Sequence, residues 1–296
     1  MAKRSIWLML LMALIWGASF PVSKVAVDII GPYAFRMAGS IVSCCVMFIL
    51  FKKEILGSVK SISFNEIIKL TIIAVPNIFV VPMLNSVALY YTSVTNATIL
   101  VYTMPCFTSI ILMGIARRIN FLSMASLALC FTGIVFTLKE VNIGIGEVVI
   151  IFSAISWAIG AVVSQKVITL VPFKVKLFWQ ILISTVLVSL CYPFLQSGSL
   201  LQPIINVFGN TQVLFSVLYL GVIGNALVYY IWFYLIQHES AESTSYATLL
   251  SPIISVIIAS LFMNEVLTVK QTLGFVLILS SAILVNVLRP YLKNNR

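Results

Sequence analysis

The sequence is poor in charged residues. Only 9% of its 296 residues are Asp, Glu, Lys or Arg, whereas 61% are hydrophobic. Soluble domains are about half apolar and roughly a quarter charged, so the composition excludes a water-soluble domain of this size. In lipid the backbone must satisfy its own hydrogen bonds, and long continuous apolar runs favour helices over the alternating pattern of barrel strands. The sequence therefore predicts an all-α integral membrane protein.

Groups that carry out chemistry are also scarce. The one histidine, His238, lies beside Glu239 at the end of an apolar run, where we interpret it as a solvated helix cap. The five cysteines lie inside apolar runs, have no CxxC spacing, and are expected to behave as small apolar side chains. The runs contain no HExxH motif, acidic pair or phosphate-binding loop. We predict that the protein is not an enzyme and binds no metal and no cofactor.

Ten apolar runs of about twenty residues are separated by polar or glycine-rich breaks. They cover 5–28, 33–51, 67–90, 94–115, 121–138, 146–167, 175–196, 211–236, 243–263 and 269–288. The first run follows a basic N-terminus, as in a signal peptide, but it continues past Ser19 to Ile30 and is better interpreted as a span. We predict ten transmembrane helices.

Lysine and arginine gather on one side of this topology. If the N-terminus is cytoplasmic, the cytoplasmic segments together carry the whole net charge of +10, and the opposite side sums to zero. The positive-inside rule then places both termini in the cytoplasm of a cell whose inner or plasma membrane holds the protein. No basic stripe with exposed aromatics indicates nucleic acid. We expect a monomer or a homodimer in the lipid bilayer.

The two halves of the chain contain matching features. Pro105 and Pro252 each lie in the middle of an apolar run, where proline breaks or kinks a helix. Asn77 in "VPNIF" corresponds to Asn225 in "IGNAL". The prolines therefore predict paired helix breaks, where freed backbone groups can face a cavity instead of lipid.

The matching features also predict the domain organisation. Trp16 in "IWGASFPVSK" corresponds to Trp157 in "SWAIGAVVSQK". Each half holds five spans, an odd number, so the second half must enter the membrane in the opposite direction. We predict two inverted five-helix repeats, residues 1–140 and 141–296, an arrangement typical of secondary transporters with a substrate site at the repeat interface.

These motifs resemble the EamA-type family of the drug/metabolite transporter superfamily. In the second half they are Pro252, the acidic Glu265 thirteen residues later, and Gly274 in the last span. In the first half they are "WGASFPVSK", "GPYAFR" with Arg36, and "TNATILVYTMPCF". The resemblance covers essentially the whole chain and implies ten spans and metabolite export or uptake, often of amino acids. The sequence departs from the family where Arg118 replaces the expected acidic counterpart of Glu265.

Polar and aromatic residues at mid-span form the candidate substrate site. On the eighth span, for example, Asn225, Tyr229 and Trp232 recur at i, i+4 and i+7 and share a helix face. Close helix packing is the alternative explanation for the hydroxyl residues, and interhelical hydrogen bonding for the asparagines. The predicted substrate-binding residues are Trp16, Ser19, Asn77, Tyr102, Trp157, Asn225, Tyr229, Trp232, Thr248 and Ser251.

Charged residues lie near the span ends. Lys24, Arg36 and Lys166 can extend toward the polar interface, so we interpret them first as anchors and alternatively as gates or contacts for a substrate carboxylate. No Asp or Glu lies at the predicted midplane. We therefore expect facilitated transport or exchange, or coupling through residues at the span ends, with a neutral pocket that suits zwitterionic or moderately apolar solutes.

The sequence thus predicts a secondary transporter of small metabolites. We expect it to export amino acids or related solutes by alternating access. One alternative is an uptake or exchange carrier for a nucleoside-type metabolite such as a nucleotide conjugate. The other is a membrane scaffold that transports nothing.

Overall fold

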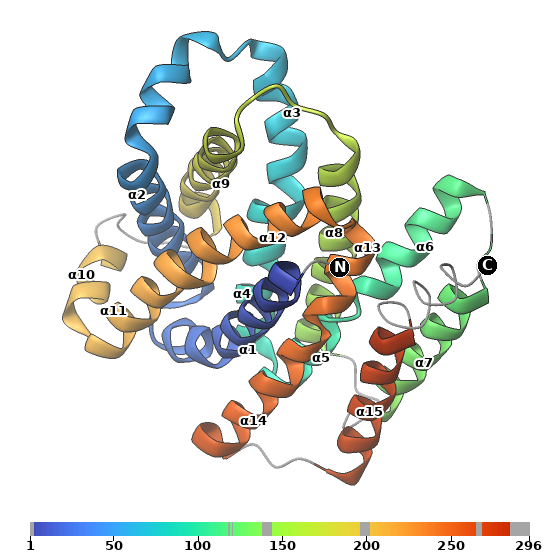
Figure 1. Ribbon diagram of the computed structural model, residues 1–296. Coiled ribbons are helices and arrows are strands. Elements are labelled where there is room, and N and C mark those ends of the chain that lie inside the picture. Colours follow the sequence, from blue (N-terminus) through green and yellow to red (C-terminus); the bar gives the residue numbers. More distant parts are fainter. Residues whose placement is uncertain are drawn as a thin grey trace.

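The computed structural model describes residues 3–117, 119, 121–137, 144–195, 202–264 and 268–284. Within these residues every regular element is a helix (Figure 1). Eight helical spans are long and apolar enough to cross a membrane. Two shorter apolar helices, Phe121–Phe136 and Val269–Ser281, lie where the fifth and tenth spans were predicted. The prediction of a multi-pass helical membrane protein is confirmed, and the count of ten spans stays a prediction.

Several spans consist of more than one helical segment. The α-helices are α1 (Lys3–Ile30), α2 (Pro32–Ser58), α3 (Phe64–Ala74), α4 (Val81–Tyr91), α5 (Val94–Val101), α6 (Met104–Ala116), α7 (Phe121–Thr137), α8 (Ile145–Lys166), α9 (Phe173–Leu195), α10 (Gln202–Gly209), α11 (Thr211–Leu218), α12 (Val228–His238), α13 (Ala241–Ala247), α14 (Ser251–Met263) and α15 (Val269–Ile283). The remaining segments are the 3₁₀-helices η1 (Val59–Ser61) and η4 (Thr248–Leu250) and the π-helices η2 (Val75–Val80) and η3 (Tyr219–Leu227).

The two mid-span prolines mark helix breaks, as predicted. α5 ends at Val101 and α6 begins at Met104, so Pro105 is the second residue of α6. Pro252 is likewise the second residue of α14, directly after η4. The first four N–H groups of a helix have no partner within it, so proline sacrifices no hydrogen bond at this position.

The two π-helices were not predicted. η2 connects α3 to α4 and contains Asn77, and η3 connects α11 to α12 and contains Asn225. A π-helix widens the turn and is common at functional sites. The matching asparagines of the two halves therefore lie in matching distortions of their spans.

Helix α8 runs antiparallel to the span formed by α3, η2 and α4. Its first turn bonds to the end of that span, and the segment after its last turn bonds to the beginning. From one end to the other, the contacts are Glu147 with Thr92, Ser153 Oγ to Asn85 Oδ1 (2.5 Å), Ser156 Oγ to the Pro76 carbonyl (3.1 Å), Asn77 Nδ2 to Ser164 Oγ (3.1 Å), and the Leu170 N–H to Glu66 (3.0 Å). Interhelical hydrogen bonds of this kind hold membrane helices together where lipid offers no hydrophobic driving force.

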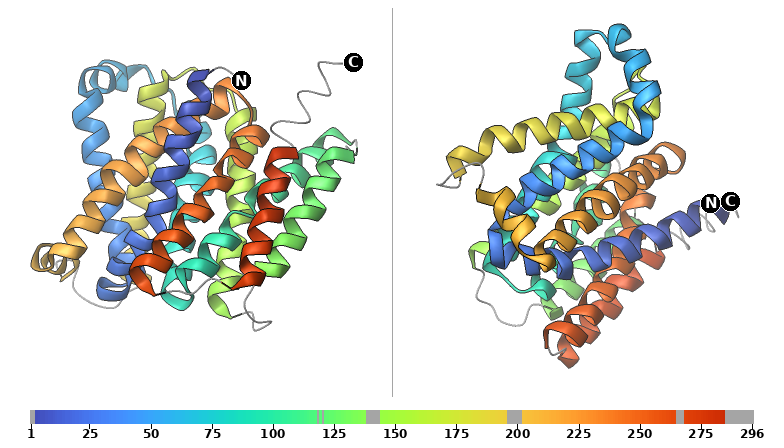
Figure 2. Two further views of the ribbon diagram at one scale, coloured as in Figure 1. Left: turned by 60° about the horizontal axis from the view of Figure 1, so that its bottom comes forward. Right: turned by 90° about the vertical axis from the view of Figure 1, so that its left-hand side faces the viewer.

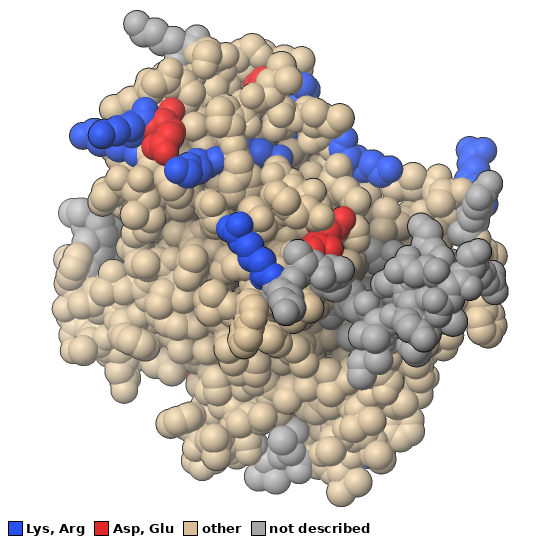
Figure 3. Space-filling model, in the orientation of Figure 1, with Lys and Arg blue, Asp and Glu red and all other residues tan. Residues whose placement is uncertain are grey.

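Corresponding spans of the two predicted halves pack against each other. α2 contacts α9, α5 contacts α14, and α7 lies beside α15 (Figure 1). The N-terminal end of α1 lies at the same end of the bundle as the ends of α2 and α12 (Figure 2). Lys and Arg gather over the upper part of the face seen in Figure 3, and the lower part of that face shows none. Arg118 and Glu265 lie outside the described residues.

Candidate functional site

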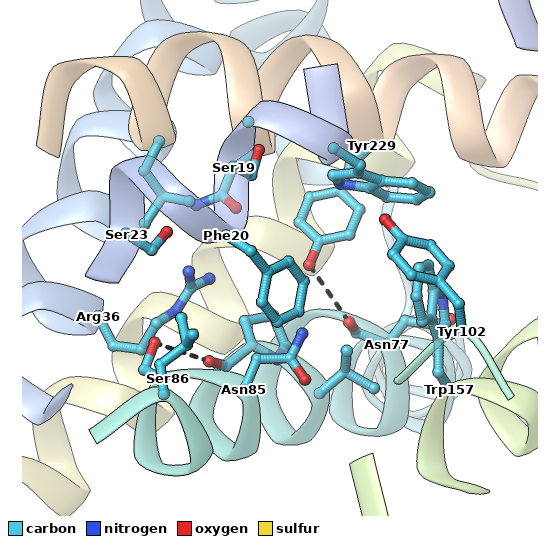
Figure 4. A pocket seen from close by; sticks show the side chains of 17 residues that line it. Ser19, Phe20, Ser23, Arg36, Asn77, Asn85, Ser86, Tyr102, Trp157 and Tyr229 are labelled. Carbon is cyan, nitrogen blue, oxygen red and sulfur yellow. Dashed lines mark hydrogen bonds between the residues drawn. The ribbon is translucent and has the colours of Figure 1, made fainter. Parts of the chain in front are cut away.

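A cavity of ≈ 60 Å³ lies in the middle of the bundle, between the two halves of the chain (Figure 4). This space admits a few water molecules and is well below the roughly 300–1,000 Å³ of typical small-molecule pockets. Its lining consists of Trp16, Ser19, Phe20, Ser23, Arg36, Asn77, Val81, Pro82, Asn85, Ser86, Leu89, Tyr102, Trp157, Leu220, Gly224, Asn225 and Tyr229.

Aromatic rings form one wall of the cavity. Trp16 and Trp157, from α1 and α8, meet edge to face with ring centroids 4.9 Å apart. Trp232 lies behind them, with its centroid 5.4 Å from Trp16 and 5.3 Å from Trp157. Tyr229 and Tyr102 flank this group at 6.5 Å from Trp16 and 6.0 Å from Trp157. Such contacts stabilise aromatic pairs beyond simple burial, so the wall is a packed unit.

Asn77 is fully buried at the base of the cavity. Its Nδ2 donates to the Ile73 carbonyl at 2.9 Å and to Ser164 Oγ at 3.1 Å, while Oδ1 has no partner. The Tyr229 hydroxyl donates to the backbone carbonyl of Asn77 at 3.4 Å (Figure 4). Gly160 makes room for this amide, because a Cβ there would lie 2.6 Å from its atoms.

Asn225 lines the cavity from the second half and is 5% exposed. Within the described part of the chain, its side-chain amide makes no hydrogen bond. Together with the free Oδ1 of Asn77, it offers a ligand both hydrogen-bond donors and acceptors.

Arg36 also lines the cavity, and this corrects the sequence interpretation. Its side chain is 5% exposed, so Arg36 does not serve as an interfacial anchor. The sequence predicted a neutral pocket, but the cavity contains the positive charge of Arg36. Lys24, in contrast, pairs with Asp28 at 2.9 Å and donates to the Leu89 carbonyl at 2.8 Å, and Lys166 is exposed.

Seven of the ten predicted substrate-binding residues line the cavity. They are Trp16, Ser19, Asn77, Tyr102, Trp157, Asn225 and Tyr229. The structure places the other three, Trp232, Thr248 and Ser251, outside the lining, although all are fully buried.

The hydroxyl residues of the ninth span differ in the hydrogen bonds that they make. Thr248 donates to the Ser245 carbonyl at 2.7 Å. One helical turn beyond Ser251, Ser255 shares a 2.9 Å hydrogen bond with Thr98 of α5. The packing explanation that the sequence left open therefore fits Ser255, whereas Ser251 Oγ is buried without a hydrogen-bond partner.

Asn85 and Ser86 also line the cavity, from α4, and were not among the predicted residues. The sequence does contain a pattern that indicates Asn85. Asn77, Val81, Asn85 and Leu89 all line the cavity and follow one another every four residues along η2 and α4. This i, i+4 spacing places Asn85 on the same face of the third span as Asn77, as on the eighth span.

The profile of the EamA-like transporter family matches residues 3–139 and again residues 144–287. The chain belongs to this family. An uncharacterized transporter of Archaeoglobus fulgidus is 24% identical over 271 residues, 87% of this chain and 89% of the relative. The uncharacterized transporter YvbV of Bacillus subtilis is 24% identical over 295 residues, 96% of this chain and 92% of that protein. Membership in the EamA-like family indicates a membrane transporter rather than an enzyme.

A solved crystal structure of another protein has a similar fold. It superposes with a TM-score of 0.71, covers 98% of this chain and 99% of its own, and is 13% identical. At that identity the likeness shows the fold alone.

Proposed function

We propose that this EamA-like protein is a secondary transporter that exports small zwitterionic or moderately apolar metabolites, such as amino acids, by alternating access. One observation carries the proposal: the central cavity combines an aromatic wall, three amides and one guanidinium, and both halves of the chain contribute to it. Transporters built from inverted repeats place their substrate between the repeats.

Several features support the inverted arrangement. The family profile matches the chain twice, once in each half. The corresponding pairs α2 and α9, α5 and α14, and α7 and α15 are in contact. Helix α8, the first span of the second half, runs antiparallel to the third span of the first half, as inversion requires. With the basic segments cytoplasmic, both termini lie inside the cell.

The cavity and its surroundings support a state closed at one end. Ser23, Ser86 and Leu89 extend the cavity toward the end of the bundle where α1 meets α2. At the opposite end, Glu54 pairs with Lys174 at 2.9 Å and Glu66 accepts the Leu170 N–H. In the proposed topology the buried Glu66 contact holds the cytoplasmic side closed and must open for substrate loading, whereas the Glu54–Lys174 pair is nearly half exposed and contributes little.

The lining favours amino acids over nucleotide conjugates. Arg36 is the one cation in the lining, so the cavity can balance a single carboxylate but not several phosphate groups. Trp16 and Trp157 offer an apolar surface for a side chain. The lining contains no Asp or Glu, which supports exchange or facilitated transport.

Counterflow into proteoliposomes tests the proposal. Vesicles containing the purified protein are loaded with unlabelled amino acids, and uptake of labelled leucine, phenylalanine, threonine and uridine is measured. We expect uptake of an amino acid that Trp16→Ala abolishes and Trp7→Ala preserves, since both lie on α1 but Trp7 is 72% exposed. Efflux from preloaded cells gives the direction. Absence of amino-acid counterflow, or equal loss in both variants, would refute the proposal.

A further inference from the structure

Arg36 is a buried cation without a protein counter-charge. It lies one turn into α2 and is 5% exposed. Among the described residues its guanidinium takes part in no hydrogen bond or ion pair. The ion pairs found in that part of the chain join Lys24 to Asp28, Lys69 to Glu66 and Lys174 to Glu54.

The guanidinium points into the cavity, near Ser23 (Figure 4). Two hydroxyls of the lining already donate to other groups. Ser86 donates to the Pro82 carbonyl at 3.0 Å, and the Tyr229 phenol, a weak base, donates to the Asn77 backbone carbonyl. The five N–H donors of Arg36 are therefore available to whatever occupies the cavity.

An uncompensated buried charge is strongly unfavourable, and a protein gains stability by replacing it with a neutral side chain. Arg36 is therefore better explained by a ligand than by the stability of the empty protein. The planar guanidinium binds a carboxylate through two parallel hydrogen bonds, which lysine cannot reproduce.

We infer that Arg36 binds the carboxylate of the transported solute at the end of the cavity away from the tryptophans. The inference rests on the proposed function and deepens it. When the cavity widens to admit a solute, the carboxylate lies at Arg36 and the apolar part lies against Trp157 on the opposite wall (Figure 4) and against Trp16, whose ring contacts that of Trp157. The cavity is then specific for solutes with one carboxylate and rejects the corresponding neutral amides.

Matched probes test this without knowledge of the natural substrate. Thermal unfolding of the full-length purified protein is followed in increasing phenylacetate and, separately, phenylacetamide, at constant ionic strength. The two differ in the carboxylate alone, and a ligand that binds the folded state raises its unfolding temperature. We expect phenylacetate to bind roughly ten- to hundredfold more tightly than phenylacetamide, as a charge-assisted hydrogen bond predicts.

Substitutions then assign the difference to Arg36. Arg36→Gln should remove the preference for phenylacetate while leaving the ligand-free protein as stable as the wild type or more so. Arg36→Lys should keep part of the preference, and it serves as the second variant if Arg36→Gln does not fold. Arg4→Gln, which removes an exposed arginine of α1, is the control and should behave as wild type.

Equal effects of the two probes on the wild type, no effect of either, or a preference that survives in Arg36→Gln would overturn the inference. The outcome is distinguishable from failure of the proposed function. Amino-acid counterflow that Arg36→Gln leaves intact would refute the role of Arg36 alone. Carboxylate binding without any counterflow would refute transport and keep the binding site.

Discussion

At the scale of single residues, the contact between Gly160 and Asn77 shows how small side chains create the site. The Asn77 amide occupies the space where a side chain at position 160 would begin, 2.6 Å from an added Cβ. The glycine therefore lets a polar residue of η2 approach α8 closely enough to bond with Ser164 at 3.1 Å. The position of Asn77 in the cavity depends on both contacts.

We predict that Gly160→Ala destabilises the protein by about 1–3 kcal/mol, the usual effect of overpacking. The amide must move, and it loses its bond to Ser164. Chemical unfolding of the purified protein measures the change. Gly114→Ala in α6, where an added Cβ meets nothing within 4 Å, is the control and should be neutral or slightly stabilising. Equal effects of the two substitutions would contradict this account.

Trp232 allows a second residue-scale prediction. Its ring is fully buried against Trp16 and Trp157, and its Nε1 has no partner. Trp232→Phe removes an unsatisfied donor and keeps an aromatic ring, so it should change stability by less than about 1.5 kcal/mol. Trp232→Ala leaves a cavity and should cost about 3–5 kcal/mol. If Trp232→Phe lowers the free energy of unfolding as much as Trp232→Ala does, the indole N–H makes a stabilising contact and this account is wrong.

At the scale of elements, one hydroxyl pair bridges α5 and α14. Thr98 and Ser255, one from each half, are both buried and share a hydrogen bond of 2.9 Å. A double-mutant cycle with Thr98→Val and Ser255→Ala should give a coupling energy of about 0.6 kcal/mol, the average for such pairs in membrane proteins. Thr98→Val combined with Ser184→Ala on α9 is the control and should show additive effects. A zero coupling for the first pair would mean that the hydrogen bond adds nothing to the contact.

The spans and helix breaks were predictable from the sequence, whereas the π-helices were not. The apolar runs located the spans and the prolines located the breaks, because both depend on local backbone and solvent preferences. The π-helices were not predictable from "VPNIFV" and "YLGVIGNAL", whose composition suits an α-helix equally well. Tyr229 and Trp232 lie about one turn apart on α12, after η3 has ended, yet only Tyr229 lines the cavity, whereas Trp232 packs against Trp16 and Trp157 behind the wall.

Arg36 shows a different limit of sequence reasoning. Its position near a span end was read correctly, since α2 begins at Pro32. The face it occupies depends on how α2 packs against distant helices such as η3 and α9, which a single sequence does not specify. A buried charge was therefore mistaken for an anchor, and the electrostatic character of the cavity was missed.

At the scale of the whole molecule, alternating access requires the two ends of the bundle to open in turn. At the end that holds the N-terminus, Ser63 caps α3 and positions Glu66, which accepts from Lys69 at 2.7 Å and from the Leu170 N–H at 3.0 Å. Through Leu170 it connects α3 to the segment between α8 and α9. Gln180 of α9 is fully buried with both amide atoms unpaired, and it lies one turn before Ser184, which donates to the Ile78 carbonyl beside Asn77 at 2.8 Å.

Glu66→Gln should weaken this connection and shift the population toward the state open at that end, because neutral glutamine holds the Leu170 N–H less strongly. In a Gln180→Cys variant whose native cysteines are replaced by alanine, we expect thiol labelling to rise by roughly fivefold or more when Glu66→Gln is added. Glu54→Gln is the control. Its pair with Lys174 lies at the same end but is nearly half exposed, so solvent screens it and labelling should change little. If both substitutions leave Gln180→Cys equally unreactive, the Glu66 contact does not hold that end closed, and the closure must depend on the apolar packing between α2 and α9.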